Sequence, residues 1–212
     1  FYKDTTPPTD PTNVAATTHE IGVPSNNPYV EITWTDATDN VSDLAGYSVL
    51  WDNASSTVPP AVMNVYAGEL YYTNPEPLTD GTDHWFHISS VDNVGNWVST
   101  VHIGPFVIDT DAPSVIEVTP SDSTLDALID TTVTVVFNEP MNVDTAEAAF
   151  SMVDDNGAPV AGTFAWFKDA TEMVFTPSSQ LEWSTQYDVM VEMTATDIAG
   201  NLLVNAPYQF SF

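Results

Sequence analysis

The sequence predicts an all-β protein of two β-sandwiches in tandem, end to end, and three observations lead to this prediction. Apolar residues alternate with polar ones over short runs, as in Val30, Ile32 and Trp34, which is the period of a strand with one buried face. Pro, Gly, Asn and Asp interrupt these runs, as expected for turns. The chain also repeats itself at long range.

The repeat is anchored at both ends of each copy. Asp4 in FYKDTTPP corresponds to Asp109 in FVIDTDAP, and Asp92 in VDNVGN corresponds to Asp197 in TDIAGN, both 105 residues apart (109 − 4 and 197 − 92). A period of this length indicates tandem domains rather than a solenoid. We therefore expect domains over 4–109 and 110–212, with residues 1–3 as the tail of a preceding domain.

Each copy has its own strand signals. Alternating runs predict strands at residues 30–34, 47–51, 133–137 and 187–193. The one persuasive helical signal is DTAEAAF at 144–150, where Asp144 is the expected N-cap and Glu147 follows three positions later.

The charge balance restricts the partners of the chain. There are 30 acidic residues against two lysines, with a net charge of −28, so binding to nucleic acid or to an anionic membrane is not expected. Such a surface attracts divalent cations, or it reflects a saline habitat that screens the repulsion. No apolar run is long enough to span a membrane, so we expect no membrane insertion in this segment.

No catalytic constellation is recognisable, and we expect no enzyme and no catalytic residues. Cysteine is absent, neither G-x-S-x-G nor H-E-x-x-H occurs, and the four histidines are scattered. His84 and His87 stand three apart on a predicted strand and face opposite sides, so one should be partly buried and the other exposed.

Both halves resemble known bacterial modules. The phrases VEITWTDATDNVSDLAGYSVLW and LTDGTDHWFHISSVDNVGN are similar to a fibronectin type III domain, although His84 stands where such domains usually place a corner tyrosine. The phrases VVFNEPMNVDTAEAAFSM, LEWSTQYDVMVEM and TDIAGNLL resemble the bacterial Ig-like domain of S-layer and other cell-surface proteins, and Tyr187 keeps the corner position. The resemblance implies two Ig-like/fibronectin type III-like β-sandwiches.

In a sandwich of this kind, the entering chain and two of the loops meet at one pole. That pole is expected to gather eight carboxylates, which are Asp4, Asp36, Asp39 and Asp92 in the first domain and Asp109, Asp111, Glu139 and Asp197 in the second. Oxygen-only ligands suit Ca²⁺, and related Ig-like arrays bind it with such aspartates, so we expect calcium at the domain junctions. The plainer alternative is that each aspartate only shapes its turn.

We therefore expect a non-catalytic, extracellular spacer within a larger bacterial or archaeal cell-surface or secreted protein of adhesin, S-layer or filament type. Its partners would be neighbouring domains of the same chain and a surface polysaccharide or another cell-surface protein. The alternative is a carbohydrate-binding accessory region of a secreted polysaccharide-degrading enzyme, with Trp85 and Trp97 as platforms for sugar rings. The plainer interpretation of these two rings, which we favour, is contact with a neighbouring strand or domain.

Overall fold

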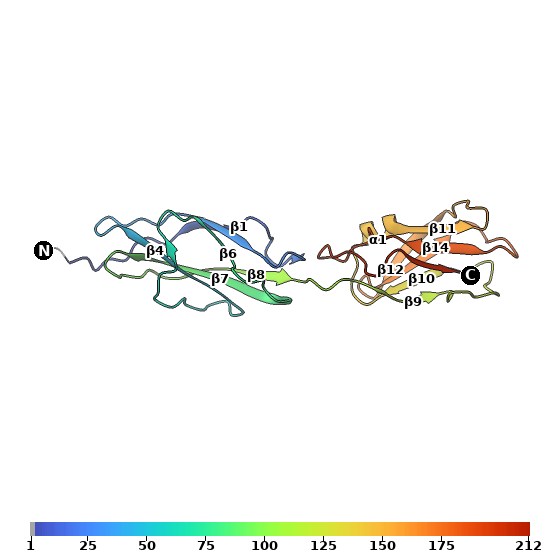
Figure 1. The fold of residues 1–212 in the computed structure, drawn as a ribbon, viewed down its shortest axis with the longest axis horizontal. Coiled ribbons are helices and arrows are strands. Elements are labelled where there is room, and N and C mark those ends of the chain that lie inside the picture. Colours follow the sequence, from blue (N-terminus) through green and yellow to red (C-terminus); the bar gives the residue numbers. More distant parts are fainter. Residues whose placement is uncertain (1–2) are drawn as a thin grey trace. The chain divides into compact units, whose positions relative to one another are not determined.

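The computed structural model describes residues 3–212, and it divides into two compact units, one ending at Thr110 and the other beginning at Asp111 (Figure 1). Each unit consists of two antiparallel or mixed β-sheets packed face to face around its own core, so the expected all-β class with Ig-like sandwiches is confirmed. The expected strand end at residues 1–3 falls mainly on Phe1 and Tyr2, which lie outside the described residues.

The first sandwich pairs a three-stranded sheet in the order β1-β3-β6 with a five-stranded sheet in the order β2-β8-β7-β4-β5. Its strands are β1 (Thr12–Ala16), β2 (Pro24–Ser25), β3 (Glu31–Thr35), β4 (Leu44–Asp52), β5 (Val65–Tyr66), β6 (Tyr71–Thr73), β7 (Gly81–Asp92) and β8 (Val101–Ile108). The core between the sheets is strongly aromatic. The rings of Trp34 and Tyr47 lie 5.4 Å apart, and those of Trp51 and Phe106 lie 5.6 Å apart.

Strand β7 departs from simple alternation because both of its faces are covered. Phe86 points into the core, and its neighbour His87 is also fully buried on the other face of the sheet. The chain beyond β7 folds back over that outer face, where the Ser89 hydroxyl donates to the carbonyl of Val98 over 2.9 Å. The expectation of one exposed histidine in this strand was therefore wrong, since His84 is buried as well.

The second sandwich pairs a four-stranded sheet in the order β12-β13-β10-β9 with a three-stranded sheet in the order β11-β14-β15. Its strands are β9 (Val115–Thr119), β10 (Val133–Phe137), β11 (Phe150–Asp154), β12 (Gly162–Phe167), β13 (Glu172–Pro177), β14 (Tyr187–Val191) and β15 (Tyr208–Ser211). Phe137, Phe175 and Phe210 are buried in its core.

The helix α1 (Val143–Ala149) lies between β10 and β11, close to the predicted segment. Its N-cap is Asn142 rather than Asp144, because the Asn142 side chain accepts a hydrogen bond from the backbone N–H of Thr145. Asp144 instead lies in the first turn, where a negative charge favours the helix dipole.

The two sandwiches fix the same corner with different side chains. In the second, the Tyr187 hydroxyl accepts a hydrogen bond from the backbone N–H of Glu182, five residues upstream, over 2.8 Å. In the first, the ring of His84 takes this place, and its Nε2 lies 2.7 Å from the carbonyl oxygen of Thr79, also five residues upstream. His84 therefore fixes the corner as Tyr187 does, but its ring contacts a backbone carbonyl, whereas the tyrosine hydroxyl contacts a backbone N–H.

We expect Tyr187→Phe to lower the free energy of unfolding by about 1 kcal/mol, because it leaves the Glu182 N–H without its acceptor. Urea unfolding followed by circular dichroism measures the change. Tyr208→Phe removes a hydroxyl from a ring at the edge of the same sheet and serves as the control. Equal stability of the two variants would contradict the role given to the corner bond.

Candidate functional site

The aspartate at the end of β7 shapes a turn with both of its oxygens. Asp92 Oδ1 accepts from the backbone N–H groups of Val94 and Asn96 over 3.0 and 2.8 Å, and Oδ2 accepts from the Asn96 amide over 2.7 Å. Gly95 supplies the positive φ that the turn requires. Asp92 is buried, with an exposed fraction of 2%.

The matching aspartate of the second sandwich repeats this geometry. Asp197 Oδ1 accepts from the backbone N–H groups of Gly200 and Asn201 over 2.6 and 2.8 Å, and Oδ2 accepts from the Asn201 amide over 2.8 Å. Asp197 is also buried, with an exposed fraction of 1%. Turn chemistry therefore accounts for each D-x-x-G-N segment, as the plainer alternative expects.

Turn chemistry does not account for the neighbours of these aspartates. In the first sandwich, Asp4, Asp39 and Asp92 each offer a carboxylate oxygen, and the three oxygens lie within 4.8 Å of one another. They come from the entering chain, the loop after β3 and the end of β7. The Ser42 hydroxyl lies among them, 2.8 Å from Asp4 Oδ2. We call these three residues the first triad.

A second triad repeats the arrangement with Asp109, Glu139 and Asp197, whose carboxylate oxygens also lie within 4.8 Å of one another. Asp109 directly follows β8, Glu139 follows β10, and Asp197 lies in the turn after β14. Six of the eight carboxylates expected at the poles thus fall into two triads.

The other two expected ligands, Asp36 and Asp111, are not members of the triads. Asp36 instead accepts a short hydrogen bond from the hydroxyl of Tyr47, which in turn accepts from the backbone N–H of Ala37. Burial and this carboxylate together raise the pKa of Tyr47. Asp36 therefore holds its own loop against the core.

Two members of the first triad are held in the ionised form. Hydrogen bonds from the backbone of Ser42 and Val41 lower the pKa of Asp39, although burial and the charge of Asp92 oppose this. Burial raises the pKa of Asp92, but hydrogen bonds from Asn96 and Val94 outweigh it, and the pKa lies below its usual value. Ionised carboxylates this close repel one another unless a cation joins them.

The chain has few cations of its own to offset this repulsion. It contains two lysines and no arginine, and Lys168 pairs with Glu172, Nζ to Oε2, over 2.5 Å. The oxygen donors of the triads suit a hard cation such as Ca²⁺, and a shell of six to eight oxygens would need backbone carbonyls or water in addition.

The structure also brings together two histidines that look scattered in the sequence. His87 and His102 are direct partners on β7 and β8, and their Nδ1 atoms lie 2.6 Å apart. On the other side of the ring, His87 Nε2 lies 2.9 Å from Asp52 Oδ1. Because a carboxylate only accepts, His87 carries its proton on Nε2, and a neutral His87 then accepts at Nδ1 from His102. Strand pairing, which the sequence does not specify, was needed to find this cluster.

The two tryptophans that the alternative interpretation uses as sugar platforms, Trp85 and Trp97, are both half-buried. Trp85 is half-buried and covers Gly104, where a Cβ atom would lie only 3.1 Å from the indole ring. Trp97 is half-buried too and forms a β-bridge with Val91. The Trp85 ring thus packs within the first sandwich.

A family model matches the part of the chain that forms the second sandwich. Residues 109–212 match the model of a family described as "Bacterial Ig-like domain", so the resemblance expected for this half is confirmed. The fibronectin type III resemblance of the first half stays a prediction. No curated protein matches the chain.

Three solved structures show distant similarity. The first is a biofilm-associated protein BSP domain, with 12% identity, coverage of 92% of this chain and 29% of that one, and a TM-score of 0.25. The second is a chimeric titin Z1Z2–Z1Z2 tandem carrying a GRGDS peptide from fibronectin, with 13% identity, coverage of 90% of this chain and 97% of that one, and a TM-score of 0.24. The third is an α-L-rhamnosidase from Aspergillus terreus, with 11% identity, coverage of 95% of this chain and 28% of that one, and a TM-score of 0.28. The chain spans less than a third of the first of these proteins. TM-scores this low do not establish a common fold.

Within residues 3–212, no helix has the length and apolar character that crossing a membrane would require.

The histidine cluster makes stability depend on pH. Burial and the neighbouring His87 lower the pKa of His102 below its ordinary 6.5, although Asp52 opposes this. The unfolded chain therefore binds more protons between the two values, and the free energy of unfolding should fall as the pH drops from about 7 through 6.5 toward the folded pKa. Urea unfolding at several pH values measures this slope.

We expect His102→Gln to flatten the slope relative to the wild-type chain. If His102→Gln keeps the wild-type pH dependence, the cluster does not control it.

Proposed function

We propose that this chain is a non-catalytic structural segment of a bacterial or archaeal cell-surface protein, and that Ca²⁺ bound at the two triads stiffens it. The Ig-like family of residues 109–212 supports a structural role for the second sandwich. The proposal places the segment outside the cell, in an adhesin, S-layer or filament type of protein. Its immediate partners would be neighbouring domains of the same chain.

The observation that carries the calcium proposal is the duplication of the triad. Independent turns have no reason to collect a third carboxylate, yet both poles do so, and they use different residues in the third place, Asp39 and Glu139. Bringing three carboxylates together twice costs free energy in a chain with net charge −28. A divalent cation would reverse the sign of that cost.

The connecting segment gives the bound ion a mechanical role. The backbone N–H of Asp109 donates to the carbonyl of Ser25 over 3.0 Å, and both the N–H and the hydroxyl of Thr110 donate to Asp80 Oδ1 over 2.8 Å. The segment is thus anchored where it leaves the first sandwich. Ca²⁺ shared by Asp109, Glu139 and Asp197 would anchor the same segment on loops of the second sandwich and restrict rotation about residues 109–113.

Small-angle X-ray scattering of the whole chain tests this role. We expect the distribution of dimensions to narrow when Ca²⁺ replaces chelator, because the connecting segment loses conformations, and we expect Ca²⁺ titration calorimetry to give two sites per chain. Binding at a hundredfold excess over the dissociation constant should also stabilise the fold by about 2.7 kcal/mol. NaCl at matched ionic strength controls for simple screening of the acidic surface.

Asp109→Ala should abolish the scattering change while both sandwiches stay folded. Asp155→Ala removes an exposed carboxylate from the turn between β11 and β12, outside the triad, and it should behave as wild type. An unchanged scattering profile in Ca²⁺, or equal effects of the two substitutions, would overturn the proposal.

A further inference from the structure

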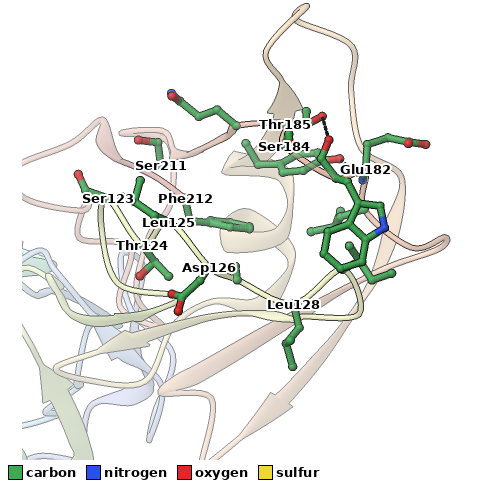
Figure 2. A pocket seen from close by; sticks show the side chains of 16 residues that line it. Ser123, Thr124, Leu125, Asp126, Leu128, Glu182, Ser184, Thr185, Ser211 and Phe212 are labelled. Atoms are coloured by element: carbon green, nitrogen blue, oxygen red, sulfur yellow. Dashed lines mark hydrogen bonds between the residues drawn. The ribbon is translucent and has the colours of Figure 1, made fainter.

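The second sandwich carries a surface groove near the start of β10, whereas its triad lies beyond the other end of that strand. The groove has a volume of about 610 Å³ and is formed by residues 123–129, residues 181–187, Ser211 and Phe212. Figure 2 shows the two loops facing each other across it. The corner that the hydrogen bond between Tyr187 and Glu182 fixes borders this groove.

Large apolar side chains are unusually exposed here. Trp183 is 76% exposed, Leu128 69% and Leu125 99%, and all three line the groove. The other five tryptophans of the chain are buried or half-buried. An exposed indole beside two exposed leucines marks a binding surface more often than a surface accident.

Both loops of the groove are fixed before any ligand arrives. The backbone N–H of Leu181 donates to the carbonyl of Ile129 over 2.8 Å and thereby ties one loop to the other. The Ser123 N–H donates to the carbonyl of Ser211 over 2.7 Å, and the Tyr187 hydroxyl holds the loop that carries Trp183 through Glu182. A ligand would therefore meet a prepared surface and order little of the protein.

Polar groups stand around the apolar surface. Asp126 lies on one loop and Glu182 on the other (Figure 2), and the hydroxyls of Ser184 and Thr185 also line the groove. A flat aromatic face bordered by carboxylates and hydroxyls offers both a stacking platform and hydrogen-bond partners. Such a combination fits a ligand with an apolar face and several hydroxyl groups.

The charge of the chain selects among the occupants of this groove. A net charge of −28 opposes anionic ligands and the approach of a second copy. A cationic peptide would be attracted by the entire surface and gains little from this groove in particular. A neutral hexopyranose has no such conflict, and with equatorial hydroxyls it presents C–H groups to an indole and hydroxyls to the rim.

We propose that this groove binds a neutral glycan chain, with one hexopyranose ring stacked on Trp183 and its hydroxyls bonded to Asp126 and Glu182. The site is separate from the calcium triads and does not depend on them. It also differs from the alternative platform at Trp85 and Trp97, which are both half-buried.

Nuclear magnetic resonance of the whole chain in chelator tests the proposal, with cellohexaose and chitohexaose as probes. The six tryptophans give separate indole N–H signals, and we expect the signal assigned to Trp183 to shift with at least one probe while that of Trp97 does not. Trp183→Ala should weaken binding by about tenfold or more. Because the indole is mostly exposed, this variant should fold as wild type, and circular dichroism checks it.

Trp97→Ala is the matched control and should bind as wild type. Binding of neither probe, or binding that survives Trp183→Ala, overturns the proposal. Self-association that depends on Trp183 would assign the groove to a second copy, and Trp183-dependent binding of hexalysine would assign it to a cationic peptide. Either result contradicts the glycan.

Discussion

Electrostatic repulsion among carboxylates is the constraint on which the rest of this structure depends. The chain has 30 acidic residues and two lysines, and it still gathers three carboxylates at one pole of each sandwich. Backbone and amide hydrogen bonds to Asp92 and Asp197 offset part of the cost locally. The aromatic core of the first sandwich and the phenylalanine-rich core of the second stabilise the folds that hold these groups together. A cation supplied by the medium would remove most of the remaining repulsion.

The second sandwich separates two kinds of surface at opposite ends of β10. Glu139 follows the strand and belongs to the triad, whereas the loop 123–129 precedes it and forms one wall of the groove. One end is polar and suited to a hard cation, and the other exposes Trp183 and two leucines. The loops of a β-sandwich can carry such different sets of side chains because the core between the sheets, rather than the loops, holds the fold together.

The sequence predicted the features that depend on periodicity and repetition. Alternation located β3, β10 and β14, and the repeat located the linker and turn aspartates that form part of each triad. It could not choose between Asp36 and Asp39, because that choice depends on the Tyr47 hydroxyl, which binds Asp36. The pairing of His87 with His102 depends on strand register, and the loop that carries Trp183 is held by the hydrogen bond between Glu182 and Tyr187. Such contacts across the chain have no signature in local sequence patterns.

The central claim is that each triad is a calcium site, and a crystal structure with anomalous scattering tests it most directly. Crystals of the whole chain soaked with Tb³⁺, which substitutes for Ca²⁺ among oxygen ligands, should show one strong anomalous peak within bonding distance of Asp4, Asp39 and Asp92 and another beside Asp109, Glu139 and Asp197. Excess Ca²⁺ should diminish both peaks. Ordered triads without a peak at either pole, in crystals that bind Tb³⁺ elsewhere, would contradict the account.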